Sequence, residues 1–190
     1  MCVPTTLASS LRGLGLCNDV HQPAWRSVDI QHWLLAFGHH WAVRSLGIRL
    51  WSEKLAFVAL EDASDPAAVV EKWHGPVPKG AGASRLEWIR REVEQAIIRC
   101  EPDAVGVRVG DPSAPSPDLL RAEGDGVAQL AAVQAGLPVA RYYRQNMQHA
   151  LEATAKGAFA AFPKTDPFIR TFHTEERDAA MVALVILNMA

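Results

Sequence analysis

Two short apolar-rich runs between residues 44 and 61, separated by a more polar segment, predict two strands joined by a tight turn. The first strand reads RSLGIRL and the second KLAFVALE, with the turn at residues 51–53. A third run, VVEKWHGPVP, contains valines and a tryptophan and closes at prolines and a glycine. Short runs of this composition bounded by turn residues are typical of strands. The sequence therefore predicts three antiparallel strands between residues 44 and 78.

Helical spacing of apolar residues replaces these strand patterns after residue 83 and predicts a helix over residues 84–100. Ser84 and Glu87 have the spacing of a capping box at its start. The residues expected on its buried face are Leu86, Ile89, Val93, Ala96 and Ile97. Its arginines lie among glutamates and are interpreted as a solvated face with i,i+3 and i,i+4 pairs. These arginines are Arg85, Arg90, Arg91 and Arg99.

The rest of the chain alternates between strands and helices. In chain order, we expect a strand at 103–110, a helix at 117–136, a strand at 137–143, a helix at 144–159, a break at 162–167 and a helix at 174–190. Gly136 is the expected C-terminal glycine of the second helix, and Thr174 the expected N-cap of the last. This order predicts an α/β fold, a mixed sheet with helices on its faces.

Composition and charge exclude several classes of protein. Hydrophobic residues make up 49% of the chain and charged residues 21%, which is ordinary globular composition. The net charge of −2 gives no global attraction for nucleic acid, so any such binding requires a local patch. The three cysteines form no CxxC pair, which disfavours a zinc or disulfide framework and favours a cytoplasmic location. No apolar run reaches the length of a membrane span.

Residues 1–42 differ from the remainder and are interpreted as an aromatic-rich N-terminal extension. They contain Trp25, Trp33, Phe37 and Trp41 without an obvious strand. The histidines of this segment that could suggest a metal site, His32, His39 and His40, have no acidic or cysteine partner at ligand spacing. We therefore expect the extension to pack on the domain over 43–190 or to dock on a protein partner. His74 and His149 are isolated in the sequence and receive no role.

Four stretches resemble motifs of the RuvC-type Holliday-junction resolvases, in the order that this family has them. They are LGIRLWSEKLAFVAL, EPDAVGVRVG, RAEGDGVAQLAAVQAGLPVARYY and ERDAAMVALVI. The match covers roughly residues 43–190, and several weak motifs in order are more specific than any one alone. The resemblance implies a ribonuclease H-like fold with a mixed five-stranded sheet flanked by helices. It also implies a homodimer, here through the helix at 118–135.

The resemblance further implies where metal-binding acids would stand, and here this chain departs from the family. The family holds two divalent ions about 4 Å apart with acids from the first strand, a later strand and the last helix. Arg49 stands at the first of these positions and Arg108 at the second, while Glu175 and Asp178 remain at the last helix. Gln148 aligns with a lysine of the family.

Two arginines change the electrostatics of such a site. A guanidinium is a permanent cation with donors only, so it cannot ligate a metal, and within about 4 Å it repels one by several kcal/mol. We therefore expect Arg49 and Arg108 to occupy the metal volume and to pair with Glu175 and Asp178. This predicts a degenerate site with no catalytic residue, metal or cofactor. The corresponding function is a pseudonuclease that binds nucleic acid or a protein partner in a DNA-processing or defence assembly.

Two other functions stay open at this point. An active Mg²⁺-dependent endonuclease could use Glu175 and Asp178 with a rearranged acid, for which Asp111, Glu123 and Asp125 are the candidates. Alternatively, the chain is a purely structural or interaction protein that docks through its N-terminal extension. Acids in a first helical turn are favoured by the helix dipole in any case, so Glu175 and Asp178 alone decide nothing.

Basic residues around the last strand could line a groove for DNA or RNA. The expected nucleic-acid-binding set is Arg49, Arg108, Arg141, Arg144 and Lys156. Tyr142 and Tyr143 could add stacking surfaces. Because side chains alternate along a strand, these two tyrosines are expected on opposite faces, with one of them in the core.

Overall fold

The computed structural model describes residues 42–63, 66–80, 82–111, 118–152 and 158–189. It contains one five-stranded sheet in the order β3-β2-β1-β4-β5. The strands are β1 (Arg44–Leu50), β2 (Lys54–Glu61), β3 (Ala68–Pro76), β4 (Ala104–Arg108) and β5 (Val139–Tyr142). β2 and β3 run antiparallel to their neighbours, whereas β4 and β5 run parallel to β1. The predicted α/β class and mixed five-stranded sheet are confirmed.

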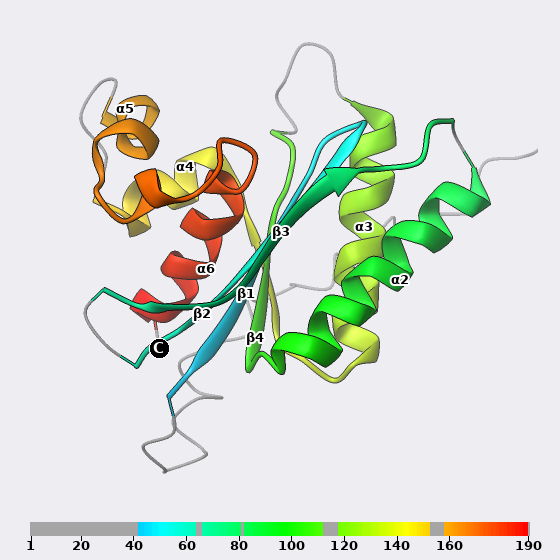
Figure 1. Ribbon diagram of the computed structural model, residues 1–190. Coiled ribbons are helices and arrows are strands. Elements are labelled where there is room, and N and C mark those ends of the chain that lie inside the picture. Colours follow the sequence, from blue (N-terminus) through cyan, green and yellow to red (C-terminus); the bar gives the residue numbers. More distant parts are fainter. Residues whose placement is uncertain (1–41, 64–65, 81, 112–117, 153–157, 190) are drawn as a thin grey trace, which may run out of the picture.

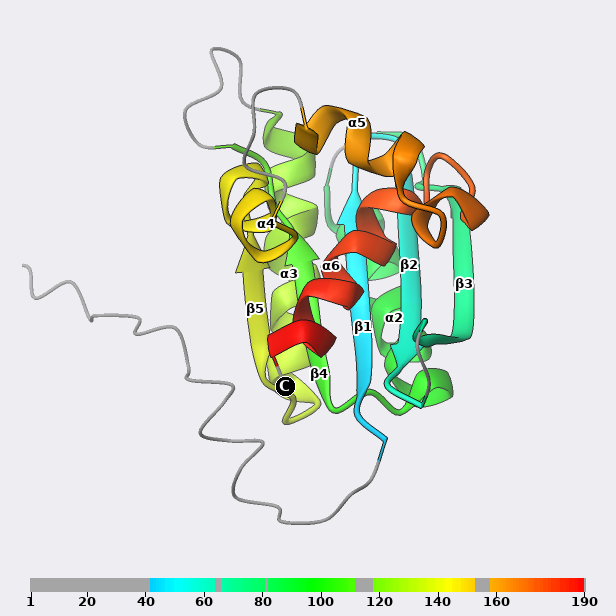
Figure 2. The ribbon, with the colours of Figure 1, turned by 90° about the vertical axis from the view of Figure 1, so that its left-hand side faces the viewer.

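Helices cover both faces of this sheet. They are α2 (Ala83–Cys100), α3 (Leu119–Gln134), α4 (Arg144–Ala150), α5 (Ala158–Thr165) and α6 (Arg177–Met189), with a short helix η1 (Ile169–Thr171) before α6. α2 and α3 pack on one face, and α6 crosses the other face over the central strands (Figures 1 and 2). No helix of the described chain is both long and apolar enough to cross a bilayer.

Strict alternation along β1 and β4 sends their side chains into two separate cores. Leu46, Ile48 and Leu50 of β1 pack in the cluster under α2 and α3. The intervening Ser45 faces α6 and donates a 2.9 Å hydrogen bond to the carbonyl oxygen of Ala183. Odd-numbered positions of β1 therefore lie under α6, which places Arg49 on that side.

Two glycines let α6 lie directly on the sheet. A Cβ atom on Gly47 would stand 2.0 Å from the carbonyl oxygen of Ala179 in α6. A Cβ atom on Gly106 in β4 would stand 2.4 Å from a side-chain carbon of Val182. Because neither position has room for a side chain, the start of α6 is held close to the adjacent ends of β1 and β4.

The helix expected over residues 144–159 is shorter in the structure, since α4 ends at Ala150. Three further predicted boundaries are wrong, each for a local reason. Gly82, with a φ of 110°, is the N-cap of α2, so Ser84 lies inside the first turn. At α6 the carbonyl oxygen of His173 accepts from the backbone of Glu176, whose carboxylate in turn accepts from the His173 N–H at 3.1 Å. This pair does the capping expected of Thr174, and α6 itself begins at Arg177.

The third wrong boundary is the expected break at 162–167, because α5 continues to Thr165 with Pro163 inside it. The proline removes a single N–H donor, and the end of the helix is held by other bonds. The Thr165 hydroxyl donates to the carbonyl oxygen of Ala161 at 3.2 Å, and the Asp166 N–H donates to that of Phe162 at 3.0 Å.

The C-terminal Gly136 of α3 is as predicted, with a φ of 77°. The extension at 1–42 lies outside the described residues except for Ala42.

Candidate functional site

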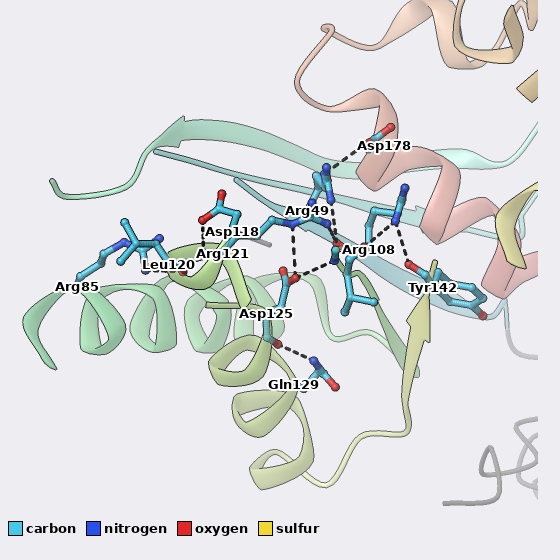
Figure 3. A network of polar contacts seen from close by, with 12 residues as sticks. Arg49, Arg85, Arg108, Asp118, Leu120, Arg121, Asp125, Gln129, Tyr142 and Asp178 are labelled. Carbon is cyan, nitrogen blue, oxygen red and sulfur yellow. Dashed lines mark hydrogen bonds and ion pairs between the residues drawn. The ribbon is translucent and has the colours of Figure 1, made fainter. Parts of the chain in front are cut away.

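Arg49 and Arg108 are register partners in the parallel pair of β1 and β4. They share the sheet face of Gly47 and Gly106, so both lie next to the start of α6. Figure 3 shows Arg49 reaching toward Asp178 of α6, with Arg108 beside it near Tyr142. The sheet thus brings together two positions that are 59 residues apart in the sequence.

Arg49 is buried, with 8% of its surface exposed. Its Nε lies 3.2 Å from Oδ2 of Asp178, and its Nη1 donates to the carbonyl oxygen of Arg108 at 3.2 Å. The guanidinium also lies 5.0 Å from the ring centroid of Trp51. Burial lowers the pKa of Arg49 to about 10, against the opposing pull of Asp178. The side chain therefore keeps its positive charge at neutral pH and places it against the α6 carboxylate.

Arg108 is anchored differently, through backbone carbonyl groups. Its Nη1 donates to the carbonyl oxygen of Val109 at 2.6 Å and to that of Tyr142 at 3.4 Å. Burial lowers the pKa of Arg108, and the charge of Asp178 opposes this effect. Its own carbonyl oxygen accepts hydrogen bonds from both Arg49 and Arg121. Arg108 is therefore the junction of an arginine cluster made of Arg49, Arg108 and Arg121.

Arg121 and Asp125 of α3 complete this cluster from the other side of the sheet, and sequence reasoning missed Arg121. Arg121 Nε lies 3.5 Å from Oδ2 of Asp125, an oxygen that also accepts from the Gly110 N–H at 3.2 Å. The i,i+4 spacing of Arg121 and Asp125 was the signal in the sequence from which their ion pair could have been predicted. The approach of α3 to the strand end could not be read from it. Asp125 is 4% exposed, and its other oxygen, Oδ1, has no hydrogen-bond partner among the described residues.

Asp125 makes the stability of the domain depend on pH. Burial raises its pKa from 3.8 to about 6, against the opposing effect of Arg121. The folded protein then holds the proton on Asp125 more tightly than the unfolded chain does. The stability that this proton contributes to the folded state is therefore complete below pH 3.8 and is lost as pH rises through about 6. A shift of about two units corresponds to about 3 kcal/mol.

We expect the free energy of unfolding of Asp125→Asn, relative to the wild type, to rise by about 3 kcal/mol between pH 4 and pH 7. The amide oxygen of asparagine still accepts from Gly110, so the change isolates the charge. Urea unfolding at several pH values measures the difference. Glu123→Gln, which removes an exposed acid of the same helix, is the control. Its free energy of unfolding relative to the wild type should stay constant over the same pH range. Parallel pH profiles for the wild type and Asp125→Asn would contradict the expectation.

Glu175 does not follow the expected pairing. Its Oε1 lies 2.9 Å from Nζ of Lys54, and its Oε2 contacts Nδ1 of His173. The hydrogen bond from Lys54 lowers the pKa of Glu175 to about 2. Of the two acids expected to pair with arginines, only Asp178 meets one, because the turn before α6 directs Glu175 toward β2. The contact of Asp178 with Arg49 is a single charge pair and not a bidentate one.

The remaining predicted residues are spread around this cluster. Arg141 and Arg144 are exposed at β5 and at the start of α4, and Gln148 is half-buried on α4. Tyr142 is buried under α6, whereas Tyr143 packs against the opposite core, which matches the expected alternation. Lys156 lies outside the described residues. Of the acids proposed to rebuild a metal site, Asp125 is committed to Arg121 and Gly110, while Asp111 and Glu123 are exposed.

Arg85 was interpreted as solvated and is in fact 2% exposed. Its guanidinium donates to the carbonyl oxygens of Leu120 at 2.9 Å and Ser52 at 3.1 Å. These bonds tie α2 to the start of α3 and to the β1–β2 turn. The helical period of α2 places Arg85 beside its buried face, which the sequence could have shown. The carbonyl oxygens that accept its hydrogen bonds belong to segments far away in the sequence, so they could not be predicted.

Comparison with known proteins identifies the architecture. No family model matches the chain, and neither does any curated protein. A structure of Thermus thermophilus RuvC in complex with a Holliday junction substrate matches with a TM-score of 0.59 at 20% identity, covering 75% of this chain and 91% of that chain. A second T. thermophilus RuvC structure gives a TM-score of 0.61 at 20% identity, covering 75% and 92%. The chain has the ribonuclease H-like fold of these resolvases.

A more distant resolvase structure has the same architecture. The yeast mitochondrial Holliday junction resolvase matches with a TM-score of 0.51 at 7% identity, covering 85% of this chain and 86% of that chain. The RuvC resemblance seen in the sequence is thereby confirmed at the level of the fold. In this ribonuclease H-like frame, the arginine cluster lies at the adjacent ends of the two central parallel strands, beside the start of the last helix (Figure 3).

Proposed function

We propose that this chain is a catalytically degenerate relative of the RuvC-type resolvases that binds nucleic acid without cleaving it. The observation that carries the proposal is the contact between Arg49 and Asp178, with Nε and Oδ2 3.2 Å apart. In the family, by the resemblance, a carboxylate stands at the position of Arg49. Here a cation built into β1 neutralises the carboxylate of α6.

The charges around this position argue against a divalent ion. Arg49, Arg108 and Arg121 bring three positive charges to one end of the sheet, where Asp125 and Asp178 contact two of them and Asp111 also acts on Arg108. Each positive charge within about 4 Å of an ion costs roughly 4 kcal/mol per unit of ion charge at an effective dielectric constant of about 20. The side chains present therefore do not fit the two-ion arrangement, and we propose no catalytic step through Mg²⁺.

The same excess of cations favours a polyanionic ligand. Arg141 and Arg144 are exposed on β5 and at the start of α4, and the charges of Arg144 and Asp111 act on Arg108 in opposite directions. Trp51, half-buried beside Arg49, offers an aromatic face next to a cation. Phosphate contacts from arginines supply most of the sequence-independent affinity of proteins for nucleic acid. The structural neighbour solved with a Holliday junction substrate makes branched DNA the first ligand to test.

The decisive experiment is a cleavage assay with purified protein and Mg²⁺ or Mn²⁺. We expect four-way junctions, duplex DNA and RNA to remain intact, because Arg49 and Arg108 stand beside Asp178, where the family resemblance implies acids that hold two ions. Mg²⁺-dependent cutting that Asp178→Asn abolishes would overturn the proposal in favour of an active endonuclease. Asp111→Asn then serves as the matched variant, because it tests whether a rearranged acid takes part.

Binding is measured separately, by electrophoretic shift with single-stranded, duplex and four-way DNA over a range of salt concentrations. A steep loss of affinity with salt supports phosphate recognition, and Arg141→Ala with Arg144→Ala is expected to reduce that slope. Absence of binding to any nucleic acid would favour the alternative of a purely structural or interaction protein with a protein partner.

We further propose that the protein forms a homodimer through α3. Its outer face exposes Leu119, Leu130 and Val133, by 71%, 52% and 59% respectively, and Ile98 of the neighbouring α2 is 65% exposed. Exposed large apolar residues grouped on one face are typical of protein interfaces. Analytical sedimentation of the protein samples used for the binding measurements gives the mass of the particle in solution, which should be that of two chains. A cytoplasmic location remains a prediction from the cysteine content.

A further inference from the structure

Two histidines that are isolated in the sequence meet at the edge of the sheet. His74 lies on the edge strand β3, and His173 lies in the turn that leads into α6. Their rings stack in parallel, with centroids 4.5 Å apart and an interplanar angle of 7°. His74, His173 and Glu175 each offer a donor atom, and these three atoms lie within 4.8 Å of one another. This group is separate from the arginine cluster, because Glu175 points toward β2 and Lys54.

Glu176 orients the first of these imidazoles. Its carboxylate is 6% exposed, and Oε1 lies 2.8 Å from Nδ1 of His74. The second oxygen, Oε2, accepts the backbone N–H of His173 at 3.1 Å. A carboxylate on one ring nitrogen fixes the tautomer and presents the other nitrogen as a ligand, which is the usual outer shell of a histidine metal site. The buried Glu176 therefore holds both histidine-bearing segments in position.

We propose that His74, His173 and Glu175 bind a divalent transition-metal ion of the zinc class. Neutral imidazoles and a carboxylate are the ligands that zinc takes in proteins, and three of them leave a tetrahedral position for water. Ligand atoms around zinc stand about 3.3 Å apart, as follows from bond lengths of about 2.0–2.2 Å. Closing the group from 4.8 Å requires movement of the exposed His173 side chain and of the turn before α6, and displacement of Lys54 from Glu175. The ion then joins the edge strand β3 to α6.

One lysine competes with the ion for a ligand, and a second lies beside the carboxylate that orients His74. Lys54 lies 2.9 Å from Oε1 of Glu175, and Lys72 lies 4.0 Å from Oε2 of Glu176. Their side chains are 53% and 46% exposed, so each can move into solvent when an ion enters. Removal of the Lys54 charge consequently strengthens binding, a result that no adventitious site elsewhere on the surface would show.

The test is calorimetric titration of the 190-residue chain with Zn²⁺ at pH 7.5. Other histidines and cysteines could also bind zinc, so the reference chain carries substitutions in the N-terminal extension. These are Cys2→Ser, Cys17→Ser, His21→Ala, His32→Ala, His39→Ala and His40→Ala. In this background we expect saturable binding of one ion per chain. His74→Ala and His173→Ala each weaken binding by at least about tenfold, and Glu176→Gln by about 10–100-fold.

His149→Ala removes an exposed histidine on α4 and is the matched control. It leaves the affinity unchanged, whereas Lys54→Met increases it several-fold. Circular dichroism confirms that the variants are folded, and Zn²⁺ raises the unfolding temperature of the control but not of His74→Ala. The proposal is overturned if the reference chain shows no saturable binding, or if His74→Ala and His173→Ala bind as tightly as their parent. The result is independent of the nuclease assay, which uses Mg²⁺ or Mn²⁺ and DNA.

Discussion

Gly47→Ala is expected to destabilise the domain by about 3 kcal/mol or more, because a methyl group has no space between β1 and α6. The added Cβ would stand 2.0 Å from the carbonyl oxygen of Ala179 and 2.7 Å from the backbone nitrogen of Ala183. Both atoms belong to the backbone of α6, so no side-chain rotation can relieve the contact. The helix must move away from the sheet, which also separates Asp178 from Arg49.

Thermal unfolding measures this effect, and a loss of 3 kcal/mol corresponds to a decrease of about 6–12 °C for a domain of this size. Gly126→Ala is the matched control, measured at a concentration at which sedimentation shows a monomer, because Gly126 lies on the α3 face proposed for the homodimer. A Cβ at Gly126, on the exposed side of α3, meets no atom within 4 Å. Alanine is preferred over glycine in a helix, so this variant should gain about 0.5–1 kcal/mol. Equal unfolding temperatures for the two alanine variants would show that α6 does not pack on β1 as described.

The double variant Arg49→Asp with Arg108→Glu is expected to become dependent on Mg²⁺ for its stability, whereas the wild type is unaffected by Mg²⁺. Two acids would then face Asp178 in place of two cations. Mutual repulsion of carboxylates lowers the unfolding temperature of the metal-free variant. An ion that binds only the folded state restores stability, by about 2.7 kcal/mol at 100 times its dissociation constant.

Differential scanning calorimetry with and without Mg²⁺ tests this prediction. The neutral variant Arg49→Asn with Arg108→Gln removes the same cations without adding acids and should show no response to Mg²⁺. If the wild type itself is stabilised by Mg²⁺ as strongly as the acidic variant, the arginines do not exclude the metal and the proposed degeneracy fails.

The local parts of the fold were predictable because they depend on neighbouring residues. Two short apolar-rich runs around a turn placed the first two strands at 44–50 and 54–61, which are the bounds found in the structure. The helix ends were less predictable, since capping depends on individual backbone angles. Gly82 and His173 took the capping positions that sequence patterns assigned to Ser84 and Thr174.

For the candidate site, the sequence alone determined that cations occupy two strand positions at which the family resemblance implies acids. The alternation of β1 also determined the sheet face on which Arg49 lies. Only the tertiary structure decided the partners. It pairs Arg49 with Asp178, gives Glu175 to Lys54, and joins Arg121 to the cluster. It also brought His74 and His173 together. Periodicity follows from the geometry of a single strand or helix, whereas these contacts depend on how separate segments pack against one another.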